Sequence, residues 1–203
     1  MTAAAFQNAV ARLIVDEPFR ARVRAEGEVA LPGRALTAAE RRRLLAAAAD
    51  PGMEITATLH RGFRLSKLLG RLPLTFELLD PAVSRRELDA FWAERPPKSF
   101  YYIEEAIAFS DYLARHAERL AIPYLAEVVA FERAGLELQR ARPDGSPPPP
   151  QRVAFEHDPT PLIEAIAAGK VPESLPRRPC ELVGRRVGGD TEWTLTERAL
   201  PGA

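Results

Sequence analysis

Apolar residues recur at helical spacing throughout the N-terminal part of the chain. Phe6 and Leu13 share one helical face, and the same pattern continues beyond Pro18. Thr37–Glu40 is a capping box, in which two side chains satisfy backbone N–H groups at the start of a helix. These signals predict consecutive helices separated by a break at 27–33.

A second helical region follows. A long apolar stripe runs from Ile55 to Leu69, and Pro73 interrupts it. Ser84–Glu87 is another capping box and predicts the start of a helix. Two prolines at 96–97 end that helix, and Pro123 fits the first turn of the last one. The remaining predicted helices of this region lie at 74–79, 101–117 and 123–141.

The pattern changes after four consecutive prolines, Pro147–Pro150, which favour an extended polyproline II spacer. Beyond them, 153–155 and 181–187 have the composition of strands, and Gly188-Gly189-Asp190 predicts a tight turn into a returning strand at 191–195. Thr160-Pro161 opens a short helix that closes at Gly169. The tail is therefore expected to form a small sheet with one helix.

Together these elements predict an α+β protein that is mainly α. We expect an N-terminal multi-helix bundle followed by a small C-terminal β-sheet with one helix. The predicted organisation is a helical domain at 1–142, a proline-rich linker at 143–151 and a small α/β domain at 152–203. A domain as small as the last is marginally stable alone and is expected to pack on the helices.

Composition narrows the function classes. The chain has 203 residues and a formal net charge of zero, so it lacks the basic surplus of most nucleic-acid-binding proteins. Its one cysteine, Cys180, excludes an internal disulfide framework and is expected to be a buried structural thiol. The sequence has no secretory leader pattern and no apolar run of about 20 residues, so we expect a cytoplasmic protein that does not enter membranes.

The residues give little support for an enzyme. No two of the three histidines have the spacing of metal ligands, and no nucleophile or phosphate-loop motif is present. His157 and Asp158 precede a helix, where a local cap is the common role of an aspartate. Glu132 lies on the apolar stripe of its helix. It is either an interface or site acid, or, as we favour, one half of a structural pair with an arginine such as Arg64.

Two surfaces are candidates for binding a partner. The aromatic cluster around 100–112 covers more than one helical face, which fits either a central core helix or a protein interface. The strand at 182–187 is expected at a sheet edge, where it could accept a peptide strand or be blunted by its arginines. The candidate partner interface comprises Tyr101, Tyr102, Glu105, Phe109 and Tyr112, and the candidate peptide-binding strand comprises Leu182, Val183, Gly184, Arg185, Arg186 and Val187.

Three segments in order resemble a known family. Arg61-Gly62-Phe63-Arg64-Leu65, continuing to Leu72-Pro73-Leu74-Thr75, is similar to its helix–proline–helix element. Phe91-Trp92, followed by Arg95-Pro96-Pro97-Lys98-Ser99, resembles its Pro-Pro-x-Ser break, and Pro123-Tyr124-Leu125, continuing to Phe131-Glu132-Arg133-Ala134, resembles its last helix. The family comprises partner subunits of multinuclear non-haem iron-dependent oxidative enzymes that modify ribosomally made peptides, as in methanobactin synthesis. One branch is catalogued as a DNA-binding domain.

The resemblance implies a non-catalytic subunit of a heterodimer. Such a chain would hold no cofactor itself, because the iron belongs to the partner enzyme, and it would recruit the precursor peptide by strand addition to the C-terminal sheet. Membranes and nucleic acids are not expected partners. Two alternatives stay open: a DNA-binding regulatory protein, suggested by the arginine pairs and the helix-plus-hairpin tail, and a free-standing enzyme that uses Glu132 or His116.

Overall fold

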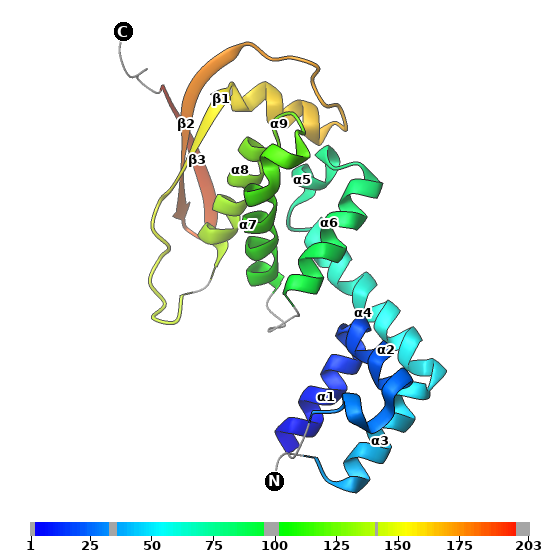
Figure 1. The fold of residues 1–203 in the computed structure, drawn as a ribbon. Helices are drawn as coiled ribbons and strands as arrows, with labels where there is room; N and C mark the ends of the chain where they lie inside the picture. Colours follow the sequence, from blue (N-terminus) through cyan, green and yellow to red (C-terminus); the bar gives the residue numbers. More distant parts are fainter. Residues whose placement is uncertain (1–2, 33–35, 96–101, 141, 198–203) are drawn as a thin grey trace. The chain divides into compact units, whose positions relative to one another are not determined.

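The computed structural model describes residues 3–32, 36–95, 102–140 and 142–197 (Figure 1). Over these ranges the chain is mainly helical, with one three-stranded antiparallel sheet near the C-terminus. The predicted α+β, mainly α class is therefore confirmed. In the described ranges no helix is both long enough and apolar enough to cross a membrane.

The chain divides into two compact units. The N-terminal unit comprises 1–66 and 92–98, and the C-terminal unit comprises 67–91 and 99–203. This division differs from the predicted boundary at 143–151, because α8 packs against the strands that follow the prolines and joins them to the helices in one unit.

Buried apolar residues of three short helices form the core of the N-terminal unit. Asp16 accepts a 2.9 Å hydrogen bond from the backbone N–H of Phe19 and so caps α2. The predicted capping box of Thr37 and Glu40 is present at the start of α3. The elements are α1 (Ala3–Val15), α2 (Glu17–Glu26), a 3-10 turn (Gly27–Ala30), α3 (Ala38–Ala49) and the first part of α4 (Pro51–Leu69).

The C-terminal unit contains the remaining helices, except for the end of α6 from Trp92 on. Two of these helices begin away from their predicted positions. α6 begins at Pro81, before the predicted capping box, because Asp80 already accepts a 2.8 Å hydrogen bond from the N–H of Ala82. α8 begins at Leu125, after Tyr124 adopts a left-handed conformation with φ of 62°. The helices are α5 (Pro73–Leu78), α6 (Pro81–Glu94), α7 (Tyr102–Leu120), α8 (Leu125–Gln139) and α9 (Pro159–Ala167).

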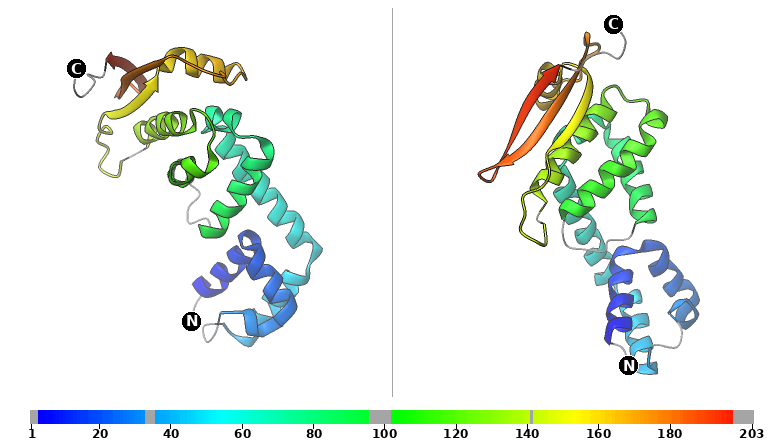
Figure 2. Two further views of the ribbon diagram at one scale, coloured as in Figure 1. Left: turned by 45° about the horizontal axis from the view of Figure 1, so that its top comes forward. Right: turned by 90° about the vertical axis from the view of Figure 1, so that its left-hand side faces the viewer.

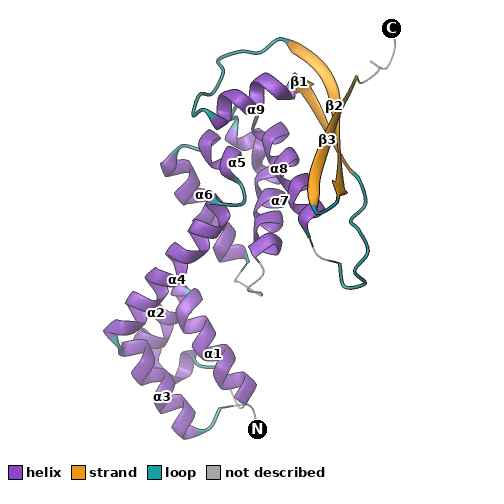
Figure 3. Cartoon of the chain, turned by 180° about the vertical axis from the view of Figure 1, so that it is seen from behind, coloured by secondary structure: helices purple, strands orange, loops and turns teal. Residues whose placement is uncertain are grey.

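The sheet has the order β1-β2-β3, and both neighbouring pairs are antiparallel. Alternate residues of β1, Val153 and Phe155, are buried, as expected for a strand with one face on a core. α8 packs against this sheet (Figure 2), and the strands lie along one side of that helix (Figure 3). The strands are β1 (Gln151–His157), β2 (Arg177–Val187) and β3 (Asp190–Glu197), with the predicted turn at 188–189.

Candidate functional site

The segment predicted as a peptide-binding edge lies in the middle of the sheet. Leu182 pairs with Val153 of β1 on one side and with Leu195 of β3 on the other, and Val183 and Gly184 are likewise paired on both sides. A peptide strand cannot add to backbone groups that are already paired. The expected edge position of these residues is therefore wrong.

The end of the same segment extends past β1. Arg185, Arg186 and Val187 pair only with β3, because β1 begins opposite Gly184. Arg186 donates a 3.1 Å hydrogen bond from Nη1 to the carbonyl oxygen of Leu138, so this end is tied to α8. The sequence predicted the strands correctly, but it did not show which of them lies in the centre.

The open edges of the sheet, within the described chain, belong to β1 and β3. Prolines directly precede β1, so a strand added to that edge could not continue its pairing beyond the start of β1. β3 contains no proline. It forms a hairpin with β2 that has a two-residue turn and an unbroken register. Because ladder hydrogen bonds fall on alternate residues counted from the turn, the backbone groups of Thr191, Trp193 and Leu195 face the open side.

A cavity of about 350 Å³ lies beside β3 in the C-terminal unit. Thr191 and Trp193 of β3 form one side of it, and residues of α8 and of the turn before α5 form the rest. Its lining combines aromatic and aliphatic surface with a few polar groups, as binding pockets do. The lining residues are Gly70, Arg71, Pro73, Leu74, Phe131, Glu132, Gly135, Leu136, Gln139, Thr191 and Trp193.

The indole of Trp193 is held in place by its neighbours. Its ring centroid lies 4.9 Å from that of Phe131 on α8. On the strand side, Trp193 pairs with Gly184, whose missing side chain leaves room for the indole. A half-buried aromatic ring between an edge strand and a cavity is suited to contact an apolar side chain of a bound peptide.

Glu132 lines this cavity and has a structural role. Its Oε1 and Oε2 accept 2.8 Å hydrogen bonds from the backbone N–H groups of Leu74 and Thr75, which are free at the start of α5. Burial raises the pKa of the Glu132 carboxyl above its ordinary value, and these hydrogen bonds act in the opposite direction. Glu132 is thus held by the backbone at the start of α5, and not by the expected pair with Arg64.

The predicted interface on α7 is mostly core. Phe109 and Tyr112 are buried, and their rings contact Phe91 with centroid distances of 5.1 and 5.7 Å. They cannot form a partner surface without unfolding the unit, so this prediction is wrong for both residues. Tyr102 and Glu105 are half-buried, and Tyr101 lies outside the described residues.

A buried carboxylate, that of Glu87, binds the polar groups at one end of the same core. Glu87 of α6 accepts a 2.9 Å hydrogen bond from the Tyr112 hydroxyl and a 2.6 Å bond from Nη2 of Arg119. The hydrogen bond from Arg119 lowers the pKa of Glu87 to about 2, with Arg86 and Tyr112 adding to the effect against the cost of burial. His116 packs edge-on against the ring of Tyr112, at 4.5 Å, which is a packing contact.

The other polar residues singled out by the sequence also tie elements together. His157 Nδ1 lies 2.8 Å from Oε1 of Glu127 and so links β1 to α8. Asp158 caps α9, as predicted. Cys180 is buried as expected, and burial raises the pKa of its thiol, which makes it a poor nucleophile.

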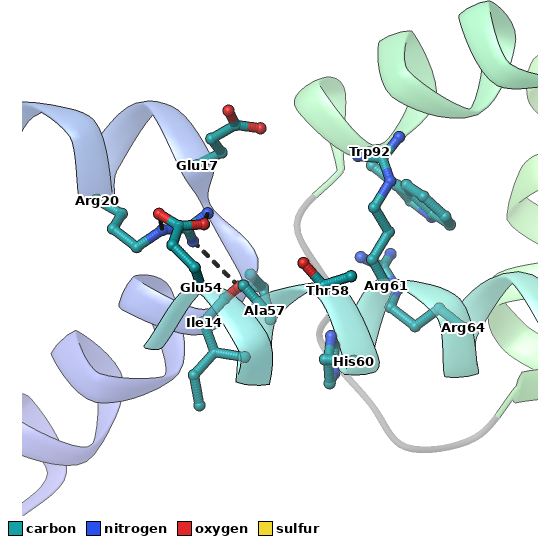
Figure 4. Close-up of a pocket in the computed structure, with 11 residues that line it drawn as sticks. Ile14, Glu17, Arg20, Glu54, Ala57, Thr58, His60, Arg61, Arg64 and Trp92 are labelled. Carbon is teal, nitrogen blue, oxygen red and sulfur yellow. Dashed lines mark hydrogen bonds and ion pairs between the residues drawn. The ribbon is translucent and has the colours of Figure 1, made fainter. Parts of the chain in front are cut away.

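A second cavity, of about 270 Å³, lies in the N-terminal unit (Figure 4). On one side Arg20 is buried and holds both carboxylate oxygens of Glu54, at 3.2 and 3.3 Å. On the other side the guanidinium carbons of Arg61 and Arg64 lie 4.9 and 4.6 Å from the centroid of the Trp92 ring. These cation–π contacts fasten Trp92 to α4.

Within the described ranges, no group of three or more histidine, cysteine, aspartate or glutamate side chains is placed to hold a metal ion. No model of a known protein family matches this chain, and neither does any curated protein sequence. Among the described residues, the open edge of β3 and the cavity beside it form the arrangement best suited to bind a partner.

Proposed function

We propose that this chain is a non-catalytic partner subunit that binds a multinuclear non-haem iron oxidase and recruits its precursor peptide. The peptide would add as a strand to the open edge of β3. The observation that carries the proposal is the position of Thr191 and Trp193, which belong to that edge and also line the cavity. Backbone pairing would supply affinity, and the cavity would select a side chain.

The geometry of a sheet explains how the two parts would act together. Side chains of a strand alternate between the two faces, so every second side chain of an added strand lies on the face that packs on α8. The cavity is on that face, because Phe131 and Leu136 of α8 line it together with Trp193. A peptide with an apolar residue at the matching position would therefore bind in a defined register.

Recruitment by a separate subunit also has a kinetic advantage. A weakly held peptide that is bound to the same complex as the iron site has a high local concentration there. The chain itself would not need a catalytic group. The iron would be held by the enzyme, and this subunit would determine which peptide is presented.

The direct test is co-expression of this chain with any multinuclear non-haem iron oxidase that is encoded beside its gene. Size-exclusion chromatography with iron analysis of each peak should give one complex that contains iron only when the enzyme is present. Separate elution of the two proteins, or iron retained by this chain alone, would contradict the proposal. Titration of the complex with the precursor peptide then tests recruitment separately.

A further inference from the structure

One face of α4 is apolar, uncharged and exposed. Ile55, Leu59 and Phe63 follow one another at intervals of four residues and are 63%, 69% and 49% exposed. The sequence predicted an apolar stripe here, and in a bundle such a stripe is normally buried. All of this face lies in the part of α4 that belongs to the N-terminal unit.

The residues between these apolar side chains are small. Gly52, Thr56, Gly62 and Ser66 are exposed on the same face, which therefore carries no charged group from 52 to 66. The two hydroxyls are already occupied within the helix: Thr56 donates to the carbonyl of Gly52 at 2.8 Å, and Ser66 donates to that of Phe63 at 2.8 Å. If another surface covered this face, neither hydroxyl would be left without a hydrogen-bond acceptor.

Nothing in the described part of the chain explains the glycine at position 62. Glycine in the middle of a helix lowers helix stability relative to alanine. Among the described residues, a β-carbon at Gly62 would meet nothing within 4 Å, so none of the elements that they form requires the glycine. A backbone that approaches from outside would require it.

The order of residues along the face is symmetrical about Leu59. Reading outward in either direction gives a small residue, a large one and another small one: Thr56, Ile55 and Gly52 on one side match Gly62, Phe63 and Ser66 on the other. In an antiparallel copy of the same helix, Leu59 would meet Leu59, and Ile55 would lie level with Phe63 but on the other side of the seam. Ile55 would then pack over Gly62 of the second copy, and Phe63 over Thr56. Large side chains would then fill the spaces left by small ones.

We propose that α4 is the two-fold interface of a homodimer, in which this face packs against the same face of a second copy. A two-fold interface must be self-complementary, and a palindromic pattern of sizes without charges meets that condition. The inference does not depend on the proposed function. Because one helix face is a small interface, we expect a dissociation constant on the order of micromolar.

The test is the mass of the full chain by sedimentation equilibrium or light scattering, from about 1 to 200 μM. We expect a concentration-dependent dimer. Leu59→Glu would bring two carboxylates together on the axis and should raise the dissociation constant about a hundredfold or more. The matched control is Val29→Glu, which makes the same kind of change at a residue that is 87% exposed and lies outside α4; it should leave the dimer unchanged.

Cross-linking tests the antiparallel register. In a Cys180→Ala background, a short bis-maleimide should join Leu59→Cys chains to one another, and should join Ile55→Cys to Phe63→Cys more efficiently than either to itself. A monomer over the whole concentration range, or a dimer that Leu59→Glu does not weaken, would overturn the proposal. So would a monomer whose binding to the iron enzyme is abolished by Leu59→Glu, because the face would then belong to that enzyme.

Discussion

Trp193 of β3 occupies the space in which a side chain on Gly184 of β2 would lie. A β-carbon built on Gly184 would be 2.6 Å from Cζ3 of the indole and 2.7 Å from Cδ1 of Leu138. The two residues are paired across the hairpin, so the glycine is what leaves room for the indole beside Leu138 of α8. The position of Trp193 at the side of the cavity therefore depends on residue 184 of β2 being a glycine.

Gly184→Ala should displace Trp193 and destabilise the protein by about 1–3 kcal/mol, as overpacking of a filled site does. Urea denaturation gives the loss, and indole fluorescence reports the displacement. Gly135→Ala is the control, because it adds the same methyl group in α8 at a point where no described residue lies within 4 Å. That variant should be neutral or more stable by up to about 1 kcal/mol. Equal effects at both positions would mean that the contact with Trp193 is unimportant.

Proline substitutions at two adjacent positions of β3 separate the role of its open edge from that of the edge paired with β2. The N–H of Leu195 faces the open side, so Leu195→Pro should leave the ladder with β2 intact and reduce peptide binding by tenfold or more, about 1.4 kcal/mol. Thr194→Pro removes a donor toward β2 and should lower stability instead. Val183→Pro, in the central strand, should prevent the sheet from folding. Undiminished peptide affinity in a folded Leu195→Pro protein, measured by calorimetry, argues against strand addition at β3.

Acid should destabilise the C-terminal unit through Glu87. Its pKa falls from 4.5 to about 2 on folding, so the ionised carboxylate favours the folded state above pH 4.5, and this contribution is lost as the pH falls toward 2. The contribution is at most about 3 kcal/mol, and water around the half-exposed Arg119 reduces it. Glu87→Gln should lower stability at pH 7 and flatten the pH dependence between 5 and 2. Glu118→Gln, an exposed change on α7, should leave that dependence as it is.

Removing the carboxylate of Glu132 should leave the start of α5 without its cap. Glu132→Ala leaves two backbone N–H groups without an acceptor, at a cost of about 2–4 kcal/mol, whereas Glu132→Gln keeps one acceptor oxygen and loses less. Hydrogen exchange at Leu74 and Thr75 should accelerate in the alanine variant. The raised pKa has the opposite consequence to that of Glu87: ionisation of Glu132 is unfavourable in the folded state, so its contribution declines as the pH rises through the folded pKa. Equal stability of the alanine and glutamine variants would show that the cap contributes nothing.

Local signals in the sequence predicted the elements well. The capping box at Thr37, the turn at 188–189 and the cap at Asp158 depend on neighbouring residues, and all three are present. The capping box at Ser84 was wrong because Asp80 and Pro81 start the same helix earlier. Two adequate start signals lay close together, and sequence alone could not rank them.

The candidate site depends on contacts between distant residues, which is why much of it was missed. That β2 lies between β1 and β3 is fixed by the pairing of β2 with β1, from which residues 158–176 separate it, and the strand patterns do not encode this pairing. Glu132 was recognised as an unusual carboxylate, but its partners are main-chain groups, which every residue carries. A tryptophan among the polar residues of β3 is a signal in the sequence that could have pointed to this strand.

The symmetrical face of α4 has a consequence for stoichiometry. Two chains joined there would carry two separate β3 edges, so one assembly would bind two precursor peptides and offer two equivalent positions for the iron enzyme. A tandem peptide with two recognition segments would then be held more tightly than a single one, provided that its spacer reaches both edges. The valence of the complex would be set by seven positions of one helix, far in the sequence from the strand that binds the peptide.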